Sequence, residues 1–249
     1  MKKTAAVFII LLILTGTSYK PIIASPHGVL LKDYHSITLY TQTSNLANYQ
    51  TLKDIILLPE TNFNETKAVE MIERINNIYS PILKSLRNEG VQLKLFTGSL
   101  TDEPSVSYLK GKKPRGYSEN GPTWDSVPGI GGSQVVLAKI GHSEKGNGHG
   151  SLNLELHELA HSIDIFVLDT IREKSSFLEI WKQEAKFVFP NRDYFLTYPE
   201  EYFAETFAMY FYSKETREQL MDLAPLTYDL FASLETINAP GKSTVLDDF

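Results

Sequence analysis

The residues best suited to chemistry in this sequence lie in the short segment Leu156-His157-Glu158-Leu159-Ala160-His161. Residues four apart lie on the same face of an α-helix, so His157 and His161 can bind one metal ion. Glu158 directly follows the first histidine and can take a proton from a water molecule at that metal. The alternative is an ordinary helix with two partly buried histidines. Apolar residues around the motif predict a helix buried on one face, which favours the metal site: Leu152, Leu156, Leu159, Ala160, Ile163 and Val167.

A catalytic zinc site needs a third protein ligand and one open position. The chain has no cysteine, so this ligand must be a histidine or an acid. Asp164 lies on the same helical face as His157 but about 10 Å further along the axis, and we interpret it as a supporting or surface acid. His142 and His149 lie in a turn region rich in Gly and Lys and are not predicted to be ligands.

The segment 199–207 offers better candidates for the third ligand. It predicts an aromatic, mostly buried helix, and Glu201 and Glu205 share one face of it. Buried carboxylates are unfavourable unless a cation or a hydrogen-bond donor meets them. We therefore expect a metal ion at one and the N–H of a ligand histidine at the other, the alternative being an exposed acidic stripe. Tyr194 and Tyr198 are both candidates to stabilise the oxyanion of a tetrahedral intermediate.

The elements that must position these residues predict an α+β fold. Short apolar runs predict strands at residues 54–59, 91–96 and 133–140. Helical spacing over residues 64–88 predicts a helix that Pro81 kinks or breaks, and residues 151–237 are nearly all helical in pattern. Strands first and helices afterwards indicate a small mixed sheet with an edge strand beside the cleft. This sheet would pack on a mostly helical C-terminal half that carries the His157–His161 helix.

A long irregular region precedes the last strand. Residues 97–132 are rich in Gly, Pro, Ser and Lys, and loops of this length inside a domain are often functional. The region ends in four residues, 129–132, that include three glycines. We predict that Gly132 and Ser133 help an edge strand to hold an extended peptide by main-chain hydrogen bonds, and that Trp124 contacts a proline-rich one. The alternative is that the glycines only turn the chain and Trp124 belongs to the core.

The composition and the N-terminus predict a secreted protein. The chain has 249 residues and a formal net charge of −6, which argues against nucleic-acid binding. Lys2 and Lys3 precede ten uncharged residues from Ala5 to Leu14, too few to span a bilayer, so residues 1–24 predict a cleaved signal peptide and no stable membrane insertion afterwards. An uncleaved membrane anchor is the alternative. Cleavage would remove three lysines and change the charge to −9.

The mature chain is predicted to be a single domain. We expect a loosely ordered leader over residues 25–50, one metalloprotease domain over 51–237 and a flexible tail over 238–249. The sequence carries no prediction of the oligomeric state.

Two segments of the sequence, LHELAHSID and YFLTYPEEYFAETFA, resemble the catalytic domain of anthrax lethal factor. They resemble still more the small secreted Pro-Pro endopeptidases of clostridia and bacilli. The similarity covers roughly residues 50–237 through further segments: ILLPETNFNETKAVEMIERI, LKLFTGSLTDE, YLKGKKPRGY, TWDSVPGIGGS and GNGHGSLNLELHE. The resemblance implies a single α+β domain with one zinc ion, bound by His157, His161 and Glu201.

The resemblance also implies roles for other residues. Glu158 matches the catalytic base, Tyr194 the oxyanion-stabilising tyrosine and Glu205 an acid that supports the ligands. Trp124 matches a tryptophan that selects substrate from a loop over the cleft, and Glu200 matches an acid that positions this loop.

One position departs from the family pattern. Pro122, two residues before Trp124, replaces a lysine that faces the acid matching Glu200 in a clostridial relative. We therefore expect the loop-to-helix ion pair to be absent and the flanking specificity to differ.

Together, these observations predict a secreted zinc-dependent endopeptidase. The expected substrate is an extended, proline-rich protein segment, with Pro-Pro bonds of surface proteins as the specific hypothesis. The alternatives are a lethal-factor-like toxin protease that acts on a host protein, and a non-catalytic module of the same fold that binds a partner. The intact set of His157, Glu158 and His161 argues against the non-catalytic module.

Overall fold

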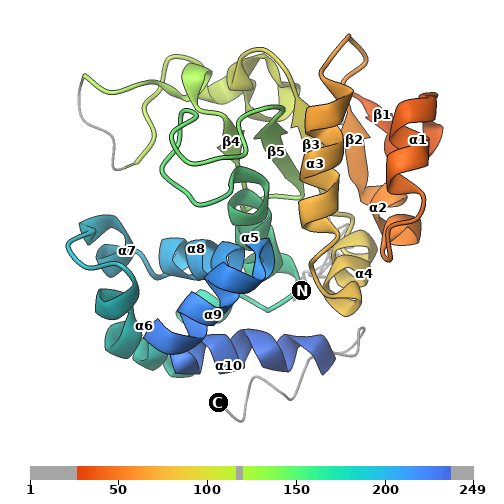
Figure 1. The fold of residues 1–249 in the computed structure, drawn as a ribbon. Helices are drawn as coiled ribbons and strands as arrows, with labels where there is room; N and C mark the ends of the chain where they lie inside the picture. Colours follow the sequence, from red (N-terminus) through yellow and green to blue (C-terminus); the bar gives the residue numbers. More distant parts are fainter. Residues whose placement is uncertain (1–26, 116–119, 237–249) are drawn as a thin grey trace, which may run out of the picture.

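The computed structural model describes residues 27–115 and 120–236. The predicted signal peptide (1–24) and C-terminal tail (238–249) lie outside these residues. In the described part, no helix combines the length and the apolar character that a membrane span requires. Figure 1 shows the sheet and the N-terminal helices in the upper half, helices α6, α9 and α10 below them, and α5 between the two parts.

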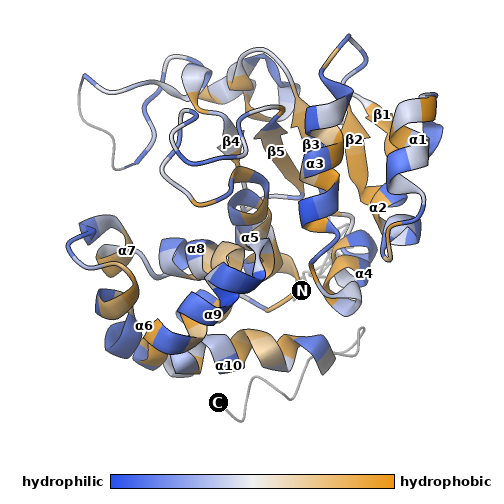
Figure 2. Cartoon of the chain, in the orientation of Figure 1, coloured by the Kyte–Doolittle hydropathy of each residue, from blue (hydrophilic) through white to orange (hydrophobic). Residues whose placement is uncertain are grey.

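A five-stranded mixed sheet forms the centre of the N-terminal half, with the strand order β1-β2-β3-β5-β4. The strands are β1 (Val29–Leu30), β2 (Ile56–Leu58), β3 (Gln92–Phe96), β4 (Gly129–Ile130) and β5 (Val135–Lys139). The central strands β2, β3 and β5 are parallel, whereas β1 and β4 pair antiparallel at the two edges. Parallel strands inside a sheet are covered on both faces and are mostly apolar, and Figure 2 shows β2, β3 and β5 largely in the hydrophobic colour, although β3 also contains Gln92 and Lys94.

The edge strand beside the cleft is β4. The predicted strand over residues 133–140 corresponds to β5, which lies inside the sheet between β3 and β4. Only two residues of β4 pair with β5, at Gly129–Ala138 and Ile130–Leu137. A strand this short gives no alternating pattern in the sequence. The sequence prediction therefore assigned the edge position to β5 instead of β4.

Four helices accompany the sheet: α1 (Ile37–Thr43), α2 (Tyr49–Ile55), α3 (Glu65–Ile75) and α4 (Ser80–Asn88). The predicted interruption at Pro81 is confirmed, because α3 ends at Ile75 and Pro81 lies in the first turn of α4. Proline is favourable there because the first turn has no intrahelical partner for its N–H. Gly90 follows α4 with a φ of 71°, a left-handed conformation that suits glycine.

The prediction of a loosely ordered leader over residues 25–50 is wrong for its described part. Residues 27–50 contain β1, a 3-10 turn, α1 and the start of α2. Leu31 and Leu39 are buried, and the Ser36 hydroxyl accepts a hydrogen bond from the Leu39 N–H as an N-cap. Each element contributes only one or two apolar residues to the core, which is too few for a recognisable periodicity.

The C-terminal half, as far as it is described, is built from the helices α5 (Leu154–Phe166), α6 (Ser175–Val188), α7 (Asp193–Thr197), α8 (Pro199–Tyr212), α9 (Lys214–Leu223) and α10 (Pro225–Ser233). Helix α5 packs against β5 and against α8. Helix α8 is buried from Glu201 to Phe211, and its Phe203 and Phe207 rings contact Phe231 of α10. The predicted α+β fold, with a small mixed sheet on a helical half, is confirmed.

Candidate active site

Helices α5 and α8 bring the three predicted metal ligands together. His157 and His161 stand on consecutive turns of α5, with ring centroids 4.9 Å apart. Glu201 lies in the first turn of α8, and its Oε2 is 3.3 Å from His157 Nε2 and 3.6 Å from His161 Nε2. One ligand atom from each residue lies within 4.8 Å of the other two. The three side chains thus form a possible metal-binding triad.

Glu205 lies one helical turn beyond Glu201 and faces the back of His157. One of its carboxylate oxygens accepts a hydrogen bond from His157 Nδ1 at 3.0 Å, and the other accepts one from the Leu152 N–H at 2.8 Å. Helical spacing alone left open which of the two acids would meet the metal, whereas the family resemblance implied Glu201. The structure places Glu201 at the triad and Glu205 behind a ligand histidine.

The donor set fits a zinc ion. Since the Glu205 carboxylate can only accept, His157 Nδ1 carries the proton, and a neutral His157 has its lone pair on Nε2. This lone pair faces Glu201 Oε2, and two such atoms repel each other unless a proton or a cation lies between them. Two imidazole nitrogens and one carboxylate oxygen are ligands of catalytic zinc, and an acid behind a ligand histidine fixes its orientation.

The metal-free triad is strongly charged. Burial alone lowers the pKa of His157, but its hydrogen bonds to Glu201 and Glu205 outweigh burial and raise this pKa to about 10. Burial alone raises the pKa of Glu201, yet its contacts with His157 and His161 hold it far below the ordinary value. Because metal ligands must be deprotonated, a proton on His157 and a metal ion compete for the same site.

Glu158 stands on α5 beside the triad, where its carboxyl group contacts the turn after β4. The Gly131 N–H donates a hydrogen bond to it, and burial raises its pKa although His157 and His161 oppose the shift. A raised pKa brings a carboxylate closer to the range in which it can exchange protons at neutral pH. A Cβ on Gly131 would lie 1.9 Å from the Glu158 carbonyl oxygen, so only glycine fits there.

A second contact fixes the same turn to α5. The buried Ser162 hydroxyl accepts a hydrogen bond from the Gly132 N–H at 3.1 Å and donates one to the Ser133 carbonyl at 2.8 Å. Ser162 lies one helical turn beyond Glu158, so the glycine-rich turn is held to α5 at two successive turns. The sequence interpretation missed Ser162, because a single serine in a helix carries no signal of its own.

Tyr194 of α7, and not Tyr198, lines the cleft beside the triad. Its side chain is 38% exposed. Partial burial and the negative charge of Glu201 raise the pKa of Tyr194 well above the ordinary value for tyrosine, so its hydroxyl stays protonated and can donate a hydrogen bond. The Tyr198 ring instead lies under the guanidinium of Arg115, 4.1 Å from its centroid. The geometry therefore favours Tyr194 as the oxyanion donor.

The ion pair that we expected to be absent forms from a different residue. Arg115 Nη2 lies 2.7 Å from Glu200 Oε1 and 3.4 Å from Glu201 Oε1. Pro122 indeed provides no charge, but Arg115 of the same irregular region supplies the cation that meets Glu200. In the sequence, Arg115 belongs to a run of basic residues that is also typical of an ordinary solvated loop.

Trp124 lines the cleft at the start of a 3-10 turn (Trp124–Ser126). The neighbouring Asp125 holds this turn, because its carboxylate accepts hydrogen bonds from the Thr101 and Thr123 hydroxyls and the Gly111 N–H. Hydrogen bonds from Thr101, Gly111 and Thr123 lower the pKa of Asp125 to about 2. The Trp124 ring is also packed against a small apolar cluster, so it is partly core and partly cleft wall.

The cleft has a volume of about 650 Å³ and contains most of the predicted site residues. His157, Glu158, His161 and Glu201 lie in it, and Gly132 and Glu200 also contribute to its wall. Ser133 is not part of this wall: its carbonyl is bound to Ser162, and its hydroxyl donates to the Val135 carbonyl at 2.7 Å. The position of Ser133 therefore does not agree with the prediction that it contacts the substrate.

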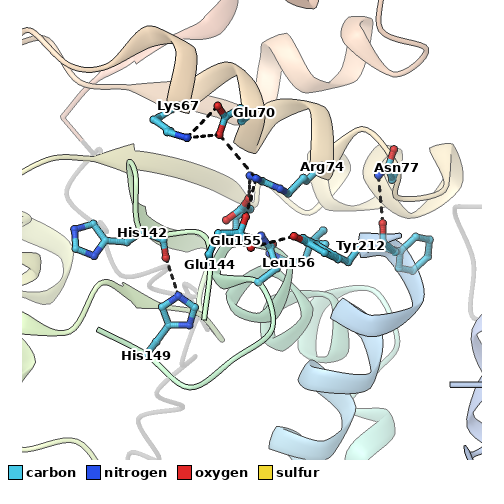
Figure 3. A network of polar contacts seen from close by, with 12 residues as sticks. Lys67, Glu70, Arg74, Asn77, His142, Glu144, His149, Glu155, Leu156 and Tyr212 are labelled. Atoms are coloured by element: carbon cyan, nitrogen blue, oxygen red, sulfur yellow. Dashed lines mark hydrogen bonds and ion pairs between the residues drawn. The ribbon is translucent and has the colours of Figure 1, made fainter. Parts of the chain in front are cut away.

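The other ionisable candidates lie outside the triad. Asp164 is fully buried and ion-paired with Arg172 at 2.7 Å, so it is neither a ligand nor a surface acid. His142 Nδ1 bonds to the Asn147 carbonyl, and His149 Nε2 bonds to the His142 carbonyl, both at 2.7 Å. Figure 3 shows His149 facing the His142 carbonyl. His149 lines the cleft, although neither histidine belongs to the described triad.

Comparison with known proteins places the chain in a family. The family model described as anthrax toxin lethal factor, N- and C-terminal domain, matches residues 41–234. A Pro-Pro endopeptidase of Paenibacillus alvei is 41% identical over 196 residues, which cover 79% of this chain and 90% of the relative. A Pro-Pro endopeptidase of Clostridioides difficile is 42% identical over 187 residues, which cover 75% of this chain and 84% of the relative.

A solved structure agrees with these matches. The structure of the Pro-Pro endopeptidase from Paenibacillus alvei superposes with a TM-score of 0.71 at 43% sequence identity, covering 74% of this chain and 99% of that one. The agreement thus extends to nearly the whole of the compared protein. The chain belongs to the family of the anthrax toxin lethal factor N- and C-terminal domain and is a homologue of these Pro-Pro endopeptidases.

Proposed function

We propose that this protein is a secreted, zinc-dependent endopeptidase that hydrolyses Pro-Pro bonds in extended, proline-rich protein segments. The observation that carries the proposal is the convergence of His157, His161 and Glu201 beside Glu158, in a cleft bordered by the edge strand β4. The names of the two relatives support the Pro-Pro specificity.

The positions of the residues support the following roles. His157, His161 and Glu201 would hold one zinc ion, and zinc at such a site supplies Lewis acidity that makes water a nucleophile near neutral pH. Glu158 takes the proton from the attacking water and later delivers it to the leaving nitrogen. Tyr194 donates a hydrogen bond to the oxyanion. Glu205 keeps His157 in the tautomer whose Nε2 is free to bind.

The cleft suits an extended peptide with few main-chain donors. An edge strand holds a peptide by main-chain hydrogen bonds, but β4 offers only a short edge at Gly129–Ile130. Proline has no N–H, so a proline-rich substrate can form few main-chain hydrogen bonds and gives up little binding energy on such a short edge. Its binding relies instead on contact with aromatic surfaces. Trp124 and Tyr194 line the cleft and can supply this contact.

Secretion is supported by the sequence alone. Lys2 and Lys3 before the apolar run from Ala5 to Leu14 have the form of a signal peptide. When the full chain is expressed in a bacterial secretion host, we expect product in the medium that starts near residue 25. Mass spectrometry of that product checks this, and an intact N-terminus retained in the membrane fraction would indicate the anchor instead.

The activity is tested with two combinatorial peptide libraries, one in which variable residues flank a Pro-Pro core and a matched one without Pro-Pro. Zinc-loaded wild type should cleave between the prolines, and elemental analysis should find one zinc per chain. Glu158→Gln should keep zinc and lose cleavage by about 10³-fold, since it keeps the shape of the side chain but cannot accept the proton.

Other outcomes favour the alternatives. A zinc-loaded wild type that cleaves only peptides without Pro-Pro would indicate a different specificity, including a toxin-like protease for a host protein. A zinc-loaded wild type that leaves both libraries intact would contradict the endopeptidase proposal and favour a binding module.

A further inference from the structure

Three arginines line the cleft, and two of them have carboxylate partners. Arg115 is paired with Glu200 at 2.7 Å, and Arg172 is paired with Asp164 at 2.7 Å. For the third, Arg192, no carboxylate lies within 4.0 Å among the residues that the structure describes. A guanidinium that has no acid partner inside a cleft is an unusual feature in a chain with an excess of acids.

The position of Arg192 is nevertheless well fixed. Its guanidinium carbon lies 4.4 Å from the centroid of the Phe195 ring, and Phe195 is itself stacked on Phe189 at 4.2 Å. Its main chain is held on both sides, because the Arg192 N–H donates to the Phe189 carbonyl and the Arg192 carbonyl accepts from the Phe195 N–H. The aromatic stack occupies one face of the guanidinium and leaves its N–H donors at the edge without a described acceptor.

The surroundings of Arg192 place it near the end of the cleft at which β4 begins. Along α5, Gly129 contacts Leu154 and Glu158, whereas Gly132 lies next to His161 and Ile165. The segment 148–150 stands at the Gly129 end, since Gly148 lies against Pro128. A Cβ on Gly150 would be 3.7 Å from Arg192 Nη2, so the guanidinium lies beside this segment.

From these contacts, we infer that Arg192 forms a subsite for a carboxylate of the substrate, namely an Asp or Glu side chain that flanks the scissile bond on one side. A planar guanidinium with free edge donors matches a carboxylate in geometry and charge. The inference rests on the proposed endopeptidase function and adds a flanking preference to it. Because the protein as a whole is acidic, the preference should be confined to the one substrate position that reaches Arg192.

The test measures kcat/KM for matched pairs of peptides. Each pair has a Pro-Pro core, an amidated C-terminus, and either Glu or Gln at a single flanking position, scanned over all positions. Wild type should prefer Glu by about 3- to 10-fold at one position, and this preference should decrease as salt is added. A parallel set with free C-termini distinguishes a side-chain carboxylate from the carboxylate at the end of a short product-like peptide.

Variants connect the preference to Arg192. Arg192→Met should bring the Glu/Gln ratio close to one, Arg192→Lys should keep part of it, and Arg192→Glu should favour Lys over Gln at that position. Arg217→Met is the matched control, because Arg217 also stacks on an aromatic ring at 4.4 Å but lies outside the cleft. The ratio is measured within each variant, so differences in expression or in fraction folded cancel.

Two results would overturn the inference without touching the proposed function: Pro-Pro cleavage with no preference for Glu at any position, or a preference that persists in Arg192→Met. A preference seen only with free C-termini would reassign the subsite to a terminal carboxylate and also contradict the side-chain inference. If wild type cleaves neither the Glu nor the Gln peptides at any position, the proposed function itself fails.

Discussion

Helix α5 contributes to two buried charge clusters that lie only two residues apart, and the fold neutralises them differently. Glu155 is fully buried and meets Arg74 of α3, whose Nη1 lies 3.0 Å from its Oε1. Arg74 Nη2 also binds Glu144 at 2.9 Å, and Figure 3 shows the guanidinium facing both acids. His157 instead faces two carboxylates of α8, and no arginine or lysine of the described residues forms an ion pair with both.

The difference separates a structural charge from a functional one. Around Glu155, the protein supplies its own cation, so the acid is neutralised as soon as α3 and α5 pack. Around His157, the nearest arginine, Arg115, reaches only the outer oxygen of Glu201, and the inner oxygen faces the two imidazoles. A buried acid therefore indicates a metal site when the fold leaves it facing lone pairs instead of a cation.

The largest expected effect is on the metal side of this comparison. Glu201→Gln removes one of the three proposed ligands and should weaken zinc binding by at least about 100-fold, with a corresponding loss of activity at limiting zinc. Glu205→Gln disturbs only the orientation of His157 and should weaken binding by about 10- to 100-fold. Competition with a chromophoric chelator measures both. Equal affinity of Glu201→Gln and wild type would show that the third ligand is a different residue.

On the structural side, the largest effect is on stability. Arg74→Met leaves Glu155 buried without its cation and should lower the free energy of unfolding by about 3 kcal/mol. Glu155→Gln removes the charge together with the need for a cation, so it should lower the free energy of unfolding clearly less than Arg74→Met does. Urea denaturation measures the difference. Both variants should bind zinc as wild type does, and a loss of zinc affinity in either would mean that the two clusters are coupled.

The pH dependence of the metal-free protein provides a third comparison. The folded state raises the pKa of His157 from 6.5 to about 10, so the stability that this group contributes is fully present below pH 6.5 and is lost as pH rises towards 10. In chelator, the free energy of unfolding should therefore fall over this range, whereas zinc-loaded protein should be much less sensitive. Burial also raises the pKa of Glu155, so the measurement is best made in Glu155→Gln. A flat profile would contradict the charged state of the empty triad.

The smallest expected effect concerns Arg115 at the rim of the site. Its side chain is about half exposed, so its ion pair with Glu200 contributes little to stability. Arg115→Met and Glu200→Gln should each lower kcat/KM by about 3- to 5-fold, because the loop that carries Trp124 loses its contact with α8. The double variant should be no worse than either single one. Additive losses would show that the two residues act separately.

The sequence predicted those parts of the site that depend on spacing within one helix. His157, Glu158 and His161 follow from the helical repeat, and the pair Glu201 and Glu205 follows from the cost of burying acids among aromatic residues. Trp124 and Gly132 were predicted from the irregular region 97–132, but the contact that Arg115 of the same region makes with α8 was not. Arg115 reaches Glu200 from a position 85 residues away in the chain, and no local pattern specifies such a contact.

The fold was predictable to a similar extent. Strands and helices with several apolar residues were predicted, including the break at Pro81. The elements that were missed are short: β4 has two residues, and α1 presents only Leu39 and Thr43 to the interior. Such elements are held by contacts with the rest of the protein, here the pairing of β4 with β5 and the packing of α1 on α3.

The close approach of Gly131 to the backbone of Glu158 has a consequence for engineering this enzyme class. No side chain can be introduced at residue 131. A Cβ at Gly129 would lie only 2.9 Å from the Leu154 side chain and 3.0 Å from that of Glu158, which is too close for normal van der Waals contact. A library that aims at new sequence selectivity should therefore leave these two positions unchanged. It should vary Ile130, which lies between them and lines the cleft, because changes there alter the rim without displacing Glu158.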